Sequence, residues 1–268
     1  MKISVFISDC KSDLMRKPRA VVFDVPIDDV SCDELIQFIV DTCISENKSI
    51  VANVNVYALN QAYQLPRFRE FFNKADVVFC DGFGVKWGGR LLGFNIKHRY
   101  TPPDWIDLLS DKLCELDITV YFLGGKPDIA QKAARNLMDR HPGLRIEGWH
   151  HGYFNKKLGS VENVALVEDI NRVKPNLLFV GFGMPLQEFW LMDNWSQIQA
   201  NVALPVGALF DYVAETIPRA PRWMTDNGLE WLGRLIVEPQ RLWRRYIIGN
   251  PLFLLRILKQ RFGLLKLD

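Results

Sequence analysis

Acidic and amide side chains follow several apolar segments of this 268-residue chain, and glycines stand beside them. Val77–Cys80 is an apolar stretch of strand length, and Asp81 comes directly after it, before the glycines Gly82 and Gly84. Glycines at such a position allow a tight turn and a close approach of the backbone to a ligand. A charged carboxylate at the end of a buried strand is therefore the first candidate for a functional group.

Three further strand ends carry residues that suit an anionic ligand. Asn53 and Asn55 lie at the end of one apolar segment, the glycine pair Gly124 and Gly125 follows a second, and a loop that contains Gly183 follows a third. Free N–H groups where helices begin after such loops form an anion site suited to phosphates. Because ligands of open parallel sheets bind at the carboxyl ends of the strands, we expect these loops to build a nucleotide-type pocket.

The usual fingerprints of nucleotide-binding enzymes are absent. The sequence has no G-x-G-x-x-G and no G-x-x-x-x-G-K-[ST] motif, which argues against a dinucleotide oxidoreductase and a P-loop NTPase. No two aspartates are two residues apart, so the D-x-D device that holds a metal on the diphosphate of many sugar nucleotides is missing. We expect no metal site, and we interpret His150-His151 as a loop feature.

The elements that must position these residues follow from the apolar pattern. Segments of strand length alternate with amphipathic segments of helical length, which predicts an α/β fold with a mostly parallel sheet and helices on both faces. The predicted strands are 20–23, 49–54, 77–80, 119–123, 144–147, 177–180 and 201–205. The predicted helices are 32–45, 56–64, 103–116, 127–140, 161–172 and 186–196.

Composition narrows the class of protein. Apolar residues make up 49% and charged residues 24%, as expected for a folded globular chain. The net charge of +2 is too small to argue for nucleic acid as a partner. Five cysteines without a C-x-x-C pair favour a reducing cytoplasm, and we expect neither a signal peptide nor a membrane-spanning segment.

The C-terminal 40 residues differ from the rest. Residues 229–268 hold eight Lys and Arg against three acids, and apolar residues are interleaved with the basic ones. We expect a helix from Pro239 that carries Arg241, Arg244 and Arg245 on nearby faces, with Arg234 extending the stripe. Such a pattern is typical of a segment that lies in a membrane surface. We therefore divide the chain into a core, 1–228, and an appendage, 229–268; docking of this appendage on the core is the other interpretation.

Several stretches, in this order, resemble the WecG/TagA/CpsF glycosyltransferase family over roughly residues 20–250. They are "ADVVFCDGFGVKWGGRLLG", "GFGMPLQEFW", "GALFDYVAETIPRAPRWMTDNGLEWLGRL" and "EPQRLWRRY". The resemblance implies a Rossmann-like core and a bacterial, inverting, metal-independent enzyme. Such an enzyme moves a sugar, often N-acetylmannosamine, from a UDP-sugar to an undecaprenyl-diphosphate-linked acceptor. It also implies a C-terminal appendage that binds the membrane and helps close the site.

The resemblance carries over to single positions. Asp81 matches the family's catalytic base, which takes a proton from the acceptor hydroxyl. Asn55 matches a pocket asparagine, and Asn53 stands where the family often has threonine. The expected substrate ligands also include two residues that match the family, Arg99 and Gln187. Three arginines of the appendage match those thought to reach the diphosphate: Arg234, Arg241 and Arg244.

The expected partners are thus a UDP-sugar, a polyprenyl-diphosphate-linked glycan and the inner face of the cell membrane. No cofactor is expected, and an exposed apolar tail would favour self-association. Two alternatives stay open: transfer of glucose or another hexose in exopolysaccharide assembly, and binding of a nucleotide-sugar or lipid diphosphate without turnover. A carboxylate retained at the strand end favours an enzyme over a binder.

Overall fold

A six-stranded parallel sheet forms the centre of the computed structural model, which describes residues 18–45 and 47–267. Its strand order is β4-β3-β8-β7-β5-β6, and every neighbouring pair is parallel. The α/β fold with a parallel sheet is thereby confirmed. The strands are β3 (Ser49–Val54), β4 (Val77–Cys80), β5 (Thr119–Gly124), β6 (Arg145–His150), β7 (Leu177–Gly181) and β8 (Val202–Pro205).

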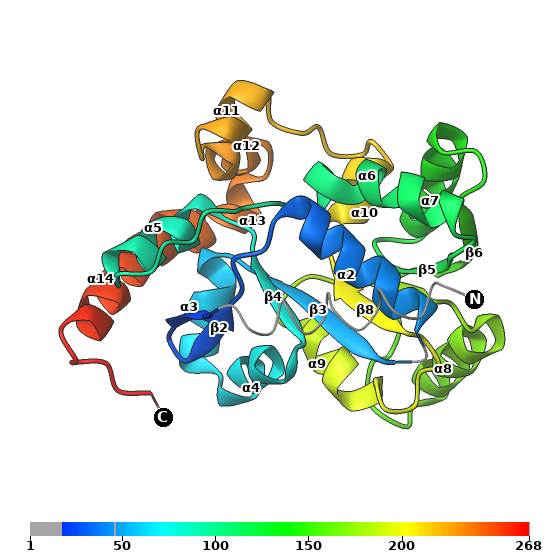
Figure 1. Cartoon of the computed structure of the whole chain (residues 1–268), viewed down its shortest axis with the longest axis horizontal. Helices are drawn as coiled ribbons and strands as arrows, with labels where there is room; N and C mark the ends of the chain where they lie inside the picture. The colour runs from blue at the N-terminus through cyan, green and yellow to red at the C-terminus, as the bar shows by residue number, and fades with distance from the viewer. Residues whose placement is uncertain (1–17, 46, 268) are drawn as a thin grey trace.

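Helices cover both faces of the sheet (Figure 1). Successive strand residues point to opposite sides of the sheet, and both sets are apolar. Val78 and Phe79, for example, point into two separate clusters of buried side chains. The cluster around Phe79 is closed by α2 (Cys32–Ile44), α6 (Pro102–Glu115), α7 (Ile129–Arg140) and α10 (Leu209–Val213). The cluster around Val78 is closed by α3 (Val56–Gln64), α4 (Pro66–Lys74), α8 (Val161–Val173) and α9 (Leu186–Asn194).

The first predicted strand does not belong to this sheet. Residues 20–23 were expected to join it, but β1 (Ala20–Val22) pairs only with β2 (Val25–Ile27) in an antiparallel hairpin. Phe23 and Asp24 form the two-residue turn with φ of 53° and 60°. Two positive φ values suit the right-handed twist of a hairpin, but a Phe-Asp pair is not the Asn-Gly type that predicts such a turn from sequence.

Helix α5 (Phe83–Leu91) begins two residues after Asp81, where the glycine-rich sequence suggested only a loop. Gly84 and Gly88 are required there by packing. A Cβ on Gly84 would lie 2.3 Å from a methyl group of Val56, and one on Gly88 would lie 2.7 Å from the ring of Phe253. The glycines therefore seat α5 against α3 and against the C-terminal helix.

The C-terminal segment is mostly helical from Arg222 to Arg261, and a helix begins at Pro239 as predicted. Its elements are α11 (Arg222–Asp226), α12 (Glu230–Val237), α13 (Pro239–Trp243), the π-helix η1 (Arg244–Ile248) and α14 (Gly249–Arg261). Helix α14 lies beside α5 and packs on α3 (Figure 1). Phe253 and Ile257 are buried in the same cluster as Val78, and Arg256 donates a hydrogen bond of 2.8 Å to Asn60.

The appendage is thus docked on the core in this structure, and the boundary at residue 229 stays a prediction. In the described part of the chain, no helix combines the length and the apolar character that crossing a membrane requires.

Candidate active site

Asp81 lies at the carboxyl edge of the sheet, where two neighbouring strands end. Its backbone N–H donates to the carbonyl of Val54, so the ladder between β3 and β4 continues to this residue and fixes its position. The amide Nδ2 atoms of Asn53 and Asn55 each lie 3.2 Å from Oδ2 of Asp81 and donate to it. No described residue donates to Oδ1, so this oxygen is free to accept a proton from a substrate.

Asn55 also caps a helix, and this contact fixes the orientation of its side chain. It is the N-cap of α3, and its Oδ1 accepts a hydrogen bond of 3.0 Å from the N–H of Ala58. Because the oxygen is engaged by the helix, the NH₂ group must point toward Asp81. The helix start therefore orients the donor that holds the carboxylate.

Asp81 combines burial with a second carboxylate nearby. The pKa of Asp81 is raised from 3.8 to about 7, mainly by burial and then by the negative charge of Glu230. The hydrogen bond from Asn55 and the positive charges of Arg245 and Arg99 act in the opposite direction. A carboxyl group with a pKa near neutrality can take up a proton at physiological pH and release it again, which is what a general base needs.

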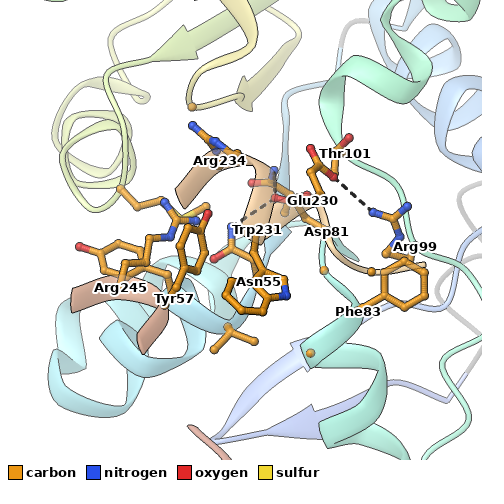
Figure 2. Close-up of a pocket in the computed structure, with 18 of the residues that line it drawn as sticks. Asn55, Tyr57, Asp81, Phe83, Arg99, Thr101, Glu230, Trp231, Arg234 and Arg245 are labelled. Carbon is orange, nitrogen blue, oxygen red and sulfur yellow. Dashed lines mark hydrogen bonds and ion pairs between the residues drawn. The ribbon is translucent and has the colours of Figure 1, made fainter. Parts of the chain in front are cut away.

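A cavity of about 440 Å³ opens above Asp81, which is within the usual size of a small-molecule site. Its walls come from the start of α3, the start of α5, the segment before α6, the loops after β7 and β8, and the helices α12 to α14. Figure 2 shows Arg245 and Tyr57 on one side of Asp81, and Arg99 and Phe83 on the other. The core and the C-terminal segment thus enclose the carboxylate together.

Arg99 and Glu230 form one wall of the cavity. An Nη atom of Arg99 lies 3.8 Å from an Oε atom of Glu230, and the guanidinium stacks 4.6 Å from the ring centre of Phe83. Gly228 makes this wall possible, because a Cβ there would lie 2.8 Å from the Phe83 ring. The start of α12 is thereby pressed against α5, and Glu230 reaches the cavity.

The appendage arginines divide into two groups. Arg234 and Arg241 line the cavity, while Arg244 is exposed and is not among the residues that line it. Arg245 lines the cavity instead. Arg241 is also paired with Glu238, and Arg234 lies 4.0 Å from the same carboxylate.

Gln187 is fully buried and does not line the cavity. Its Oε1 accepts hydrogen bonds from the N–H groups of Gly183 and Gly207, at 3.1 and 3.2 Å. Its Nε2 donates to Glu188 at 2.7 Å. Gln187 therefore connects the loops after β7 and β8. Its two backbone partners, Gly183 and Gly207, both line the cavity.

Gly124 and Gly125 are not brought to the cavity either. Gly124 ends β5 and Gly125 follows it; β5 lies three strands from β3, so at about 4.8 Å per strand the two glycines lie about 14 Å from the end of β3. A Cβ on Gly124 would lie 2.4 Å from the carbonyl oxygen of Gly181, and the N–H of Gly125 donates to that oxygen. These glycines let two loops approach each other; their role as substrate ligands stays a prediction.

The remaining predicted residues are Asn53, Asn55, Gly82, Arg99 and Gly183, which all line the cavity with Asp81. Sequence reasoning missed two notable lining residues, Tyr57 and Glu230, and it placed Arg245 on the basic helix without including it among the expected ligands. Glu230 stands out afterwards as one of three acids in a basic tail, and Arg245 as the direct neighbour of a predicted ligand. Nothing in the sequence distinguishes Tyr57 from a core aromatic residue.

Chemically, the cavity offers two carboxylates, Asp81 and Glu230, and several cations. Among residues 18–45 and 47–267, no three His, Cys, Asp or Glu side chains converge as a metal site would need. The groups that line the cavity and can meet negative charge are arginines and N–H groups at helix starts. Such a set suits transfer of a group away from a phosphate.

Comparison of the sequence with known proteins identifies a matching family and several relatives. The sequence profile described as "Glycosyl transferase WecG/TagA/CpsF family" matches residues 20–266. A Bacillus spizizenii protein is 27% identical over 219 residues, which cover 81% of this chain and 82% of the relative. A Staphylococcus aureus protein is 28% identical over 220 residues, with 81% and 82% covered. Both relatives are named N-acetylglucosaminyldiphosphoundecaprenol N-acetyl-beta-D-mannosaminyltransferase.

Proposed function

The chain belongs to the WecG/TagA/CpsF family of glycosyl transferases, and we propose from that premise which sugar it transfers and how. The proposed reaction moves N-acetylmannosamine from its UDP derivative to N-acetylglucosaminyl-diphospho-undecaprenol, in the synthesis of a bacterial cell-surface polysaccharide. The names of the relatives support the choice of sugar and acceptor. The observation that carries the mechanism is Asp81, held by two asparagines at the floor of a cavity lined with arginines.

In the proposed step, Asp81 takes the proton from the attacking hydroxyl of the acceptor. The hydroxyl oxygen bonds to the anomeric carbon of the donor sugar as the bond from that carbon to the diphosphate oxygen breaks. Attack from the side opposite the leaving group inverts the anomeric configuration. The pKa of Asp81, about 7, lets the carboxylate accept this proton near neutral pH.

The leaving UDP carries the negative charge that the reaction develops. Arg99, Arg234 and Arg241 line the cavity and are the proposed counter-charges, since a guanidinium matches phosphate oxygens in geometry. No metal is assigned a part in this step. Gln187 is proposed to act indirectly, because its hydrogen bonds hold the loops of Gly183 and Gly207 at the cavity wall.

A membrane-bound acceptor requires that the enzyme reach the membrane surface, and we propose that the C-terminal helices do so on the cytoplasmic side. Large apolar side chains are exposed there, and exposed basic residues lie among them. A basic group near an anionic leaflet contributes about 1 kcal/mol. The exposed apolar residues are Trp243, Ile247, Ile248, Leu254, Leu255, Leu258, Phe262 and Leu264. The exposed basic residues are Arg241, Arg244, Lys259, Arg261 and Lys266.

The test is a donor screen with a short-chain N-acetylglucosaminyl diphosphate lipid, with and without anionic vesicles. We expect UDP release with UDP-N-acetylmannosamine that exceeds release with UDP-glucose, and a higher rate when vesicles are present. Preference for UDP-glucose would overturn the sugar assignment. Saturable binding without UDP release from any donor would identify a binding protein instead of an enzyme.

A further inference from the structure

Glu188 is a buried carboxyl group that takes no part in the proposed transfer step. It lies in the first turn of α9, and its side chain is fully buried, although glutamate is almost never fully buried unless it is paired. Its Oε1 accepts a hydrogen bond of 2.7 Å from Nε2 of Gln187. Its Oε2 is also buried, and no described residue donates a hydrogen bond to it. Half of this carboxyl group is therefore left unsatisfied in the interior.

Stability alone does not account for a carboxyl group at this place. Burial raises the pKa of Glu188 to about 7, and the hydrogen bonds from Gln187 and from its own backbone N–H offset this only in part. An acid in the first turn of a helix interacts favourably with the helix dipole, but burying a carboxylate without full hydrogen bonding costs more. An apolar side chain of similar volume would avoid this cost. What it could not replace is the hydrogen bond to Gln187.

The side-chain amide of Gln187 depends on this hydrogen bond. Gln187 is fully buried, so each polar atom of its amide needs a partner inside the protein. Its Oε1 accepts from the N–H groups of Gly183 and Gly207, and in the described part of the chain its Nε2 donates to Glu188. Without that acceptor, the buried NH₂ group would have to turn or move toward water. The Oε1 atom would then leave the two N–H groups that it holds.

The loops after β7 and β8 are connected by Gln187 where the backbone ladder between the two strands ends. The N–H of Val206 still donates to the carbonyl of Val180, at 2.8 Å. Beyond this point, the hydrogen bonds of Gln187 to Gly183 and Gly207 join the loops. Further residues of the same loops line the cavity: Met184, Ala208 and Leu209. The hydrogen bond from Gln187 to Glu188 thus supports one wall of the active-site cavity from inside the core.

We propose that Glu188 is a positioning residue for sugar transfer, which acts by fixing Gln187 and thereby the loops after β7 and β8 at the cavity wall. Glu188 is not among the residues that line the cavity, so it acts through Gln187 and not on the substrate. This inference rests on the proposed function for its effect on transfer. Its effect on the loops can be measured in the free protein, without a substrate.

The experiment compares the full-length wild-type chain with E188M, E188Q, Q187M and the double variant Q187M/E188M. Amide hydrogen exchange followed by NMR measures the protection of the N–H groups of Gly183 and Gly207, and kcat/KM for transfer is measured beside it. Loss of one buried hydrogen bond corresponds to a change of about 10-fold. We expect E188M to exchange both glycine amides about 10-fold faster and to lower kcat/KM by about 10-fold. The N–H of Val206, whose acceptor lies in β7, should keep its wild-type protection.

Rescue and coupling distinguish positioning from packing. E188Q keeps an oxygen that can accept from Gln187, so its exchange and kcat/KM should stay within about threefold of wild type. Q187M/E188M should transfer sugar no more slowly than Q187M, because both substitutions remove the same link. T42V is the control: Thr42 is buried and donates 2.7 Å to Phe38 within α2, which does not line the cavity. T42V should lower the melting temperature without a change in kcat/KM.

Several results would overturn the proposal. One is exchange and kcat/KM of E188M within about twofold of wild type, even if the melting temperature falls, because Glu188 would then be a packing residue. Faster exchange with unchanged kcat/KM, a loss in E188Q equal to that in E188M, or independent losses in Q187M and E188M that multiply in the double variant would overturn it as well. If E188M exchanges the glycine amides faster and the wild-type chain transfers no sugar, the link between the loops stands and the proposed reaction falls.

Discussion

Replacing Asp81 with asparagine should stabilise the fold even as it removes the proposed base. The pKa of this carboxyl is about 7 in the folded protein and 3.8 as its ordinary value, which we take for the unfolded chain. Between these two values the unfolded chain ionises while the folded protein stays protonated, so wild-type stability falls as pH rises. Above a pH of about 7 both states are ionised and the penalty is constant.

The linkage relation gives the size of the effect. With these two pKa values, the stability of D81N relative to wild type should increase by about 2 kcal/mol between pH 5.5 and pH 8.5. Asparagine keeps an oxygen that can accept from Asn53 and Asn55, so the local hydrogen bonds survive. Glu188, whose pKa burial also raises to about 7, is present in both proteins and cancels in the difference.

The assay is urea unfolding of both proteins at the two pH values, with the free energy of unfolding taken from the midpoint and slope. A stability difference that does not change with pH would refute the assignment of a raised pKa to Asp81. A difference that shrinks as pH rises would show that the fold stabilises the carboxylate and lowers the pKa of Asp81.

Three further predictions concern the second carboxylate, the appendage and metals. E230Q should move the acidic limb of the pH profile of kcat/KM to lower pH, because the Glu230 charge raises the pKa of Asp81; a limb that stays in place or moves up would contradict this. Truncation after Gly228 should abolish transfer and lower the melting temperature, because it removes buried Phe253 and Ile257, and loss of one buried Phe side chain alone costs about 3–5 kcal/mol. A truncated chain with full activity would rule out a role for the appendage arginines. Transfer should be unaffected by EDTA, and a loss restored by a divalent cation would show that arginines alone do not neutralise the diphosphate.

The position of Asp81 could be predicted because it depends only on the residues directly before it in the sequence. An acid directly after an apolar strand lies at the carboxyl edge of a parallel sheet whatever the strand order. Asn53 and Asn55 reach it because β3 and β4 are consecutive strands joined by helices, and such strands are usually neighbours. Three of the site residues therefore follow from sequence.

Gly124 and Gly125 show where this reasoning fails. Their loop has the same appearance as the others, but strand order decides whether it can reach the cavity, and periodicity carries no information about order. Arg244 and Arg245 show a second limit. Helical spacing assumes 3.6 residues per turn, and the π-helix breaks that register at these residues.

Glu230 shows a third limit, since it reaches Arg99 through long-range packing. Gly228 must meet the Phe83 ring for α12 to begin there, and these two residues are far apart in the chain. No local pattern reports that contact. The hairpin of β1 and β2 was not predicted for a local reason instead, because Phe23 and Asp24 adopt a turn that their residue types do not predict.

The most direct test of the mechanism is sugar transfer by D81N beside its affinity for UDP. A general base contributes about 100- to 10,000-fold to a rate, so the rate of transfer should fall by that factor. UDP affinity should stay close to wild type, because the proposed diphosphate ligands are arginines and not Asp81. Transfer by D81N near the wild-type rate would show that another group accepts the proton.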